Sequence, residues 1–226
     1  KIKEIVLENY DKQILLAGHH PVFSNGNHGG FFPFKDHLFP LTALHKSLFI
    51  PLPVLGSLHP MFRKNIGSIQ DLNNTRYQLF ITELLTAING HPNFIYASGH
   101  EHNLQYFNKQ NQHFIVSGSG SKTKYVAKRK SAEFTYKKQG FCKVLYLDSG
   151  ETWIEYWVVS EDNPVAGTLV FRKKIKAGKE SNDTSKENKT ILIAASDKFE
   201  AGPLKRLILG SHHREVWGAP VEVDVL

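Results

Sequence analysis

The sequence predicts an α/β domain whose sheet changes from parallel or mixed to antiparallel. Two short apolar runs that suit buried strands, residues 13–17 and 94–96, have an amphipathic helix between them, and strand–turn–strand patterns follow from residue 104 onward. This order of elements is typical of an α/β sheet with an antiparallel part. The 226 residues are 41% hydrophobic and 22% charged, which is ordinary for a globular chain and argues against intrinsic disorder.

The chain opens with a helix and a strand. Apolar residues recur on one face of residues 1–9, which predicts the end of an amphipathic helix. Residues 13–17 are a continuous apolar run, as expected of a strand covered on both faces. The strand ends at Gly18, and the Gly-, Asn- and Ser-rich stretch up to Gly30 is expected to be an exposed functional loop.

Residues 31–68 are apolar, aromatic and interrupted by five prolines. We expect an insertion packed over the domain, because long structureless loops are uncommon without burial. A substrate-facing lid and a partner surface are the alternatives. After this segment, apolar residues three and four apart predict a helix over residues 74–89, which ends at Gly90.

The second half of the chain reads as strands and turns. Residues 104–107 and 113–117 form one expected hairpin, and residues 141–147 and 152–159 form another. Residues 168–175 are expected to add a further strand.

Composition divides the chain into three expected parts. Residues 1–176 hold the domain, and residues 177–190, which are almost all small, polar or charged, suit a linker. Residues 191–226 are expected to be a C-terminal extension. This extension either leads into a following domain or caps the same domain with a strand and a helix.

The net charge of +7 comes largely from two Lys-rich stretches, residues 122–138 and 172–189. We expect solvated segments and no nucleic-acid partner, although the first stretch could instead attract an anionic substrate. The single cysteine, Cys142, excludes an internal disulfide framework and is expected to pack in the core.

Histidine is the informative residue type, because five of the twelve histidines fall in two Gly-rich loops. The expected strand at residues 94–98 stops at Gly99-His100-Glu101-His102. Residues two apart in an extended backbone share a face, so His100 and His102 are expected to serve one metal or two neighbouring metals while Glu101 points away.

His19 also follows a strand, and ligands of α/β sheets bind outside the carboxyl ends of strands. Three imidazoles are therefore expected at one site. A hydrolytic centre with two metals also needs oxygen ligands, which usually include bridging carboxylates. No acid stands in a suitable motif, and the nearest are Asp11, Asp36, Asp71 and Glu101.

Four short motifs occur along the chain in the order and spacing of a known protein family. They are Gly-His-His-Pro-Val-Phe-Ser at residues 18–24, Asn-His-Gly at 27–29, Gly-His-Glu-His-Asn-Leu-Gln-Tyr at 99–106 and Val-Ser-Gly-Ser-Gly at 116–120. In order and spacing, residues 1 to about 160 resemble the second half of a calcineurin-like metallophosphoesterase, and the nearest subgroup is the tartrate-resistant, purple acid phosphatase type.

The resemblance implies the C-terminal half of an αββα sandwich, with mixed sheets flanked by helices. It also implies a phosphomonoesterase or phosphodiesterase with two metal ions, of Fe, Zn or Mn, and a metal-bound hydroxide. His19 and His100 would bind the second metal and His102 the first. His28 would be the catalytic histidine, which steadies a phosphate oxygen or protonates the leaving group.

Three further residues are expected around this centre. His20 is expected in the second shell or at the pocket rim, because adjacent residues at a strand end face opposite ways. Asn27 stands where the subgroup usually has an acidic residue, which affects the expected pH optimum. Asn103 is expected to support the site or contact substrate.

The family's first-half motifs, which supply aspartate and asparagine ligands, have no counterpart here. We therefore expect a fragment whose missing N-terminal half completes the centre. Residues 210–220 resemble the segment that precedes an outer-membrane domain in large bacterial members, which implies membrane association through a following domain and a periplasmic or outer-membrane location. The alternatives are a non-catalytic binding or outer-membrane-associated module and a hydrolase with a single zinc.

Overall fold

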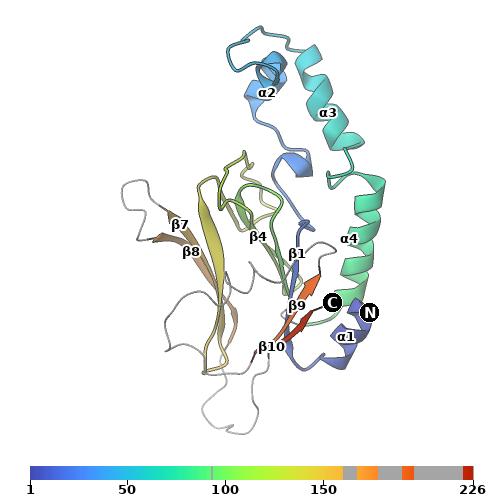
Figure 1. The fold of residues 1–226 in the computed structure, drawn as a ribbon, viewed down its shortest axis with the longest axis vertical. Helices are drawn as coiled ribbons and strands as arrows, with labels where there is room; N and C mark the ends of the chain where they lie inside the picture. Colours follow the sequence, from blue (N-terminus) through green and yellow to red (C-terminus); the bar gives the residue numbers. More distant parts are fainter. Residues whose placement is uncertain (93, 160–166, 178–189, 196–220, 226) are drawn as a thin grey trace.

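The computed structural model describes residues 1–92, 94–159, 167–177, 190–195 and 221–225, and it is an α/β structure with one mixed and one antiparallel sheet (Figure 1). The helical elements, three of them short 3₁₀ turns, are α1 (Ile2–Glu8), η1 (Asn27–Gly29), α2 (Phe34–Leu38), η2 (Pro40–Ala43), η3 (Leu55–Ser57), α3 (Leu58–Asn65) and α4 (Thr75–Ile88).

The mixed sheet has seven strands in the order β10-β9-β1-β2-β4-β3-β5. Their bounds are β1 (Gln13–Gly18), β2 (Ile95–Ser98), β3 (Leu104–Lys109), β4 (Gln112–Ser117), β5 (Phe134–Tyr136), β9 (Thr190–Ala195) and β10 (Val221–Val225). The five strands from β10 to β4 are parallel, and β3 and β5 then add antiparallel pairs. The carboxyl ends of β1 and β2, which carry the two histidine loops, are therefore neighbours at one edge of the sheet.

The second sheet is antiparallel, in the order β6-β7-β8. Its strands are β6 (Gly140–Tyr146), β7 (Thr152–Val159) and β8 (Gly167–Lys176). Apolar side chains alternate along the mixed sheet, so that both faces are covered. Ile14 and Leu16 of β1 join the core cluster that contains α1 and α4, whereas Leu15 packs against the cluster that contains β7.

Helix α4 is positioned by its buried face and its N-terminal cap. Its buried side chains, spaced three and four apart, are Tyr77, Ile81, Leu84 and Ile88. The Asn74 side chain accepts a hydrogen bond from the Arg76 backbone N–H, which satisfies one of the free donors at the start of the helix. The helix thereby covers the face of the sheet toward which Ile14 and Leu16 point.

The sequence correctly predicted the α/β class, the strands β1 and β2, helix α4 and both hairpins. The strand expected at residues 168–175 is β8, and the short strand β5 was not anticipated. Of the expected linker at 177–190, residues 178–189 lie outside the described residues. Within the expected extension at 191–226, β9 pairs in parallel with β1 and β10 pairs with β9, so both strands belong to the mixed sheet.

The expectation that residues 31–68 pack over the domain is wrong. These residues form α2, η2, η3 and α3, and α2 and α3 lie beyond the sheet at one end of the long axis of the molecule (Figure 1). Many of their large apolar side chains are exposed, including Phe34 and Leu44 at 78% and 81%. Prolines interrupt this segment without preventing short helices, and the helices pack mainly on one another.

A histidine buried between the two sheets links stability to pH. His113 is 3% exposed, its Nδ1 lies 2.8 Å from the Tyr106 hydroxyl, and burial lowers its pKa to about 4. The unfolded chain takes up a proton near pH 6.5, so stability is lost as pH falls from about 6.5 through 4, by up to about 3 kcal/mol. Urea unfolding at pH 7.5 and at pH 5 should show a smaller pH dependence for His113→Gln than for the parent chain. An unchanged dependence would contradict this assignment.

Candidate metal centre

Three imidazoles converge where β1 and β2 end. One ring nitrogen each from His19, His20 and His100 lies within 4.8 Å of the others. His19 and His20 directly follow Gly18, the last residue of β1, and His100 follows β2 by two residues. The parallel pairing of β1 with β2, in which Gly18 is the partner of Ser98, places both loops at the same edge. The order of strands in the sheet therefore brings these three histidines together.

The donor set fits a metal ion. The Nε2 atom of His19 and the Nδ1 atom of His100 are 3.1 Å apart. Two nitrogens of a tetrahedral zinc site, each about 2.0–2.1 Å from the ion, lie about 3.3 Å from each other. A cluster of imidazoles suits Zn, Fe, Cu or Ni. Among the described residues, this group contains no carboxylate.

The surroundings of the cluster lower the pKa of two of its histidines, His100 and His20. Burial and then the neighbouring His28, His20 and His19 lower the pKa of His100 to about 3, against a small opposing effect of the Gln70 backbone. Burial followed by His19 and His28 likewise lowers the pKa of His20. A metal binds the unprotonated imidazole, so these two side chains are ready as ligands at neutral pH.

His100 has an unusual backbone conformation, with a φ of +59°. Left-handed conformations are uncommon for residues other than glycine and often occur at functional sites. This turn breaks the extended geometry after β2, so the alternation of faces expected along Gly99-His100-Glu101-His102 does not apply. His102 consequently lies outside the three-histidine group.

Glu101 is fully buried and holds the first histidine loop in place. Its Oε1 atom accepts hydrogen bonds from the Ser24 hydroxyl at 2.6 Å and from the His28 backbone N–H at 2.9 Å. Gly26 lies so close to this carboxylate that a Cβ atom there would overlap it. Glu101 therefore ties the two histidine loops together.

His28 lies next to the cluster and has an acidic partner. Its ring centroid is 4.2 Å from that of His100, and its Nδ1 atom is 2.9 Å from Oδ1 of Asp71. Asp71 is fully buried and also accepts hydrogen bonds from Arg63 and Ser68. Burial alone would raise the pKa of Asp71, but the Arg63 and Ser68 hydrogen bonds outweigh it and lower the pKa to about 2.

The structure places the other expected residues as follows. His20 is within the cluster, so the expectation that it faces away from His19 is wrong, because the chain turns immediately after β1. The Nδ1 atom of His102 is buried without a hydrogen-bond partner among the described residues. Asn27 belongs to η1, and its Oδ1 atom is also buried and unpartnered. Asn103 is buried and bonds to Gln105 and to the Tyr125 carbonyl.

Sequence reasoning missed two residues that hold His28, namely Asp71 and Arg63. They lie 43 and 35 residues from His28, and no local motif marks either of them. The Lys-rich stretch at 122–130 is also closer to the site than expected for a solvated segment. Its backbone bonds to both loops, from Lys124 N–H to the His102 carbonyl and from Ala127 N–H to the Asn25 carbonyl.

Comparisons with known proteins assign this chain to no family. Neither the protein-family models nor the curated proteins give a match. Among solved structures, the chain aligns with GAP50, described as the anchor in the inner membrane complex of Plasmodium. The TM-score is 0.37 and the identity 20%, over 48% of this chain and 33% of that chain. The chain thus spans about a third of that protein's length, and a likeness of this degree carries no functional argument.

In the part of the chain that the structure describes, no helix is long and apolar enough to cross a membrane. The expected periplasmic or outer-membrane location stays a prediction.

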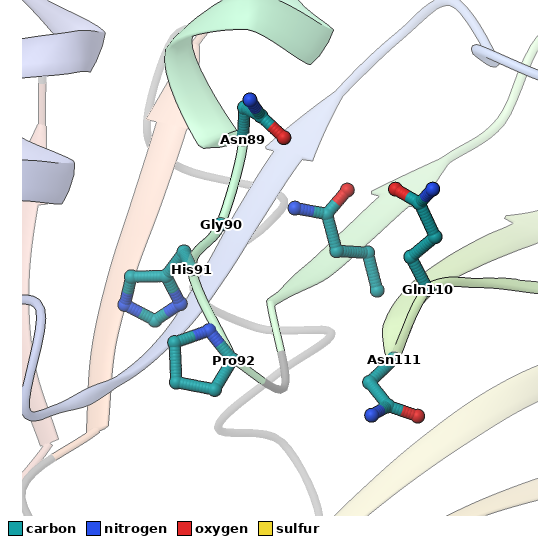
Figure 2. Close-up of a pocket in the computed structure, with 7 residues that line it drawn as sticks. Asn89, Gly90, His91, Pro92, Gln110 and Asn111 are labelled. Carbon is teal, nitrogen blue, oxygen red and sulfur yellow. The ribbon is translucent and has the colours of Figure 1, made fainter.

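A separate pocket of about 290 Å³ lies at the opposite edge of the sheet, where β2 and β4 begin (Figure 2). It is lined by Asn89, Gly90, His91, Pro92, Gln110, Asn111 and Gln112. His91 is 1% exposed, and its ring contacts those of Tyr10 and Phe94. Its burial and packing are therefore those of a core residue. This pocket holds no cluster of ligating groups, so it is not the candidate site.

Gly118 offers a test of how the second histidine loop is supported. A Cβ atom at this position would overlap the Glu101 carbonyl, which is backbone and cannot rotate away. Gly118→Ala should therefore lower the free energy of unfolding by about 1–3 kcal/mol and weaken metal binding. Gly120→Ala is the matched control, because no atom lies within 4 Å of its added Cβ. Equal effects of the two changes in urea unfolding would contradict the proposed contact.

Proposed function

We propose that this chain carries the imidazole part of a metal-dependent hydrolase that cleaves phosphoric esters. The observation that carries the proposal is the convergence of His19, His20 and His100 within 4.8 Å, beside the His28–Asp71 pair. Metal-ligating groups next to a positioned acid–base residue are the arrangement that hydrolysis requires. The substrate class rests on the resemblance of the histidine motifs to those of metallophosphoesterases.

The three imidazoles would hold the ion, and a bound Zn, Mn or Fe ion would supply Lewis acidity toward a phosphoryl oxygen. The described residues suit one ion, because they add no carboxylate to the group. A two-metal centre, as the resemblance implies, would need oxygen ligands beyond those in the described group, and the unpartnered Nδ1 atom of His102 would then be available to the other ion.

His28 serves as the proton donor to the leaving group. With Nδ1–H donating to Asp71, His28 gives the proton on Nε2 to the leaving group, and Nε2 is left with a lone pair. Asp71 fixes the orientation of the ring, and Arg63 and Ser68 in turn fix Asp71. This buried pairing lets the imidazole keep one orientation while its proton is transferred.

Positive charge near the two histidine loops favours an anionic ester as the substrate. Lys122, Lys124, Lys128 and Lys130 are exposed, and the backbone of their stretch is bonded to both histidine loops. A local cationic field raises the concentration of anionic substrates near a site.

The test uses the full-length product of the gene. Metal analysis should find bound metal in the parent protein, and p-nitrophenyl phosphate and bis(p-nitrophenyl) phosphate should be hydrolysed only when metal is present. His28→Ala should lower kcat by about 100-fold or more and leave the metal content unchanged. Absence of bound metal would refute the proposal.

One observation favours a second candidate, a non-catalytic binding module. Both Asp71 oxygens are bonded to Arg63 or Ser68, and Oε1 of Glu101 accepts from Ser24 and the His28 backbone. Metal bound without turnover of either ester, in the full-length product, would select this candidate over the hydrolase.

A further inference from the structure

An exposed apolar surface covers residues 34–66, which we call the apolar tip. It carries eleven of the nineteen large apolar side chains that are exposed among the described residues. They are Phe34, Leu44, Leu48, Phe49, Ile50, Val54, Leu55, Leu58, Met61, Phe62 and Ile66. Exposed apolar side chains gathered in one segment indicate an interaction surface in a folded protein, whereas scattered apolar residues need no explanation.

The apolar tip is an ordered scaffold and not a loose loop. The Leu52 N–H donates to the Leu38 carbonyl at 2.8 Å, which holds the segment before η3 against α2. Gly56 of η3 approaches the His37 backbone so closely that a Cβ atom would overlap it. The rings of Phe39 and Phe49 are 5.6 Å apart. The apolar side chains therefore face outward from a fixed backbone.

The apolar tip projects beyond both sheets (Figure 1). Phe34, Leu44 and Val54 are 78%, 81% and 78% exposed, as expected of side chains on a projection. The helices α2 and α3 stand at one end of the long axis, away from both sheets (Figure 1). A projecting apolar end suits insertion into a layer of lipid headgroups, whereas a bound peptide needs a groove.

The charge of the apolar tip identifies the kind of surface. Residues 34–66 contain Lys35, Lys46, Arg63 and Lys64 against the single acid Asp36. The three lysines are exposed, and none of them makes an ion pair with any described residue. Two copies of the tip facing each other would bring like charges together, which disfavours self-association. Anionic lipid headgroups provide the opposite charge.

We propose that the apolar tip docks the protein onto an anionic lipid bilayer by inserting its apolar side chains among the headgroups while its lysines contact lipid phosphates. Lysine stems can lie along the apolar layer with the ammonium groups at the phosphates. This inference is independent of the proposed hydrolysis.

The test measures sedimentation of the purified chain with vesicles of phosphatidylcholine mixed with phosphatidylglycerol, and with vesicles of phosphatidylcholine alone. The parent chain should bind the anionic vesicles at least about tenfold more tightly. Leu44→Ser/Val54→Ser should weaken that binding at least about tenfold, because both side chains are solvent-exposed and contribute little to folding. Leu7→Ser/Leu79→Ser, at 62% and 60% exposed positions of α1 and α4, should leave it unchanged.

A second pair of double variants tests whether binding depends on the lysines of the apolar tip or on positive charge elsewhere in the protein. Lys35→Glu/Lys46→Glu should abolish the preference for anionic vesicles, and Lys128→Glu/Lys130→Glu, outside the tip, should retain it. The proposal is overturned if the parent chain does not bind anionic vesicles or if both members of either pair lose binding equally. It is also overturned if light scattering shows a dimer that Leu44→Ser/Val54→Ser dissociates, because a second copy then occupies the tip.

Discussion

Replacing His100 by asparagine is expected to lower zinc affinity by more than about 100-fold. The imidazole of His100 packs against those of His19 and His28, with ring centroids 5.0 and 4.2 Å away. Loss of a supporting residue in a metal site already costs about 10- to 100-fold, and loss of a direct ligand costs more. Asparagine tolerates the left-handed φ of +59° better than alanine, so the loop keeps its conformation.

Isothermal titration with zinc chloride at pH 7.5 measures this effect. His45→Ala is the control, since His45 is exposed and lies outside the cluster. Thermal unfolding of the metal-free proteins should be similar for the parent chain and His100→Asn. Retention of zinc affinity in His100→Asn would show that the three imidazoles do not form a ligand set.

The second large effect is expected for Asp71→Asn, which removes the acid that holds His28. The carboxylate is fully buried and paired with Arg63, whose side chain is 20% exposed. Removing one partner of a buried ion pair leaves the other charge uncompensated, which costs about 3–5 kcal/mol. We expect a loss of about 3 kcal/mol in the free energy of unfolding, because Arg63 retains some contact with solvent.

The dependence of stability on pH gives an independent test of the role of Asp71. The folded pKa of Asp71 is about 2, below the ordinary value of 3.8, so the unfolded carboxyl takes up a proton first as pH falls. The stabilisation, about 2 kcal/mol, is complete above about pH 4 and is lost as pH falls through 2. Asp71→Asn should lack this part of the acid dependence in urea unfolding, and exposed Asp148→Asn should retain it. Identical curves for the parent and Asp71→Asn would contradict the assignment.

The parts of the fold that follow a local period were predictable from the sequence. Apolar runs located β1 and β2, helical spacing located α4, and turn residues located both hairpins. Parallel strand order then brought His19 and His100 together, as expected for residues at the carboxyl ends of neighbouring strands.

The prediction failed where the backbone leaves regular geometry or where a contact joins distant residues. Alternation of faces does not extend past Gly18 or through His100, which is why His20 lies inside the cluster and His102 outside it. Asp71 reaches His28 across 43 residues, so nothing beside either residue indicates the pair. Period-based reasoning has no means to detect such contacts.

Arg63 belongs to the same short helix as Met61 and Phe62, yet it also bonds to Asp71. Helix α3 therefore carries exposed apolar side chains and is also connected, through Arg63 and Asp71, to His28. A shift of α3 along its axis would change the Arg63–Asp71 contact and, through it, the orientation of the His28 ring. The helix that carries part of the apolar tip is thus separated from the His28 ring by only two contacts, Arg63 to Asp71 and Asp71 to His28.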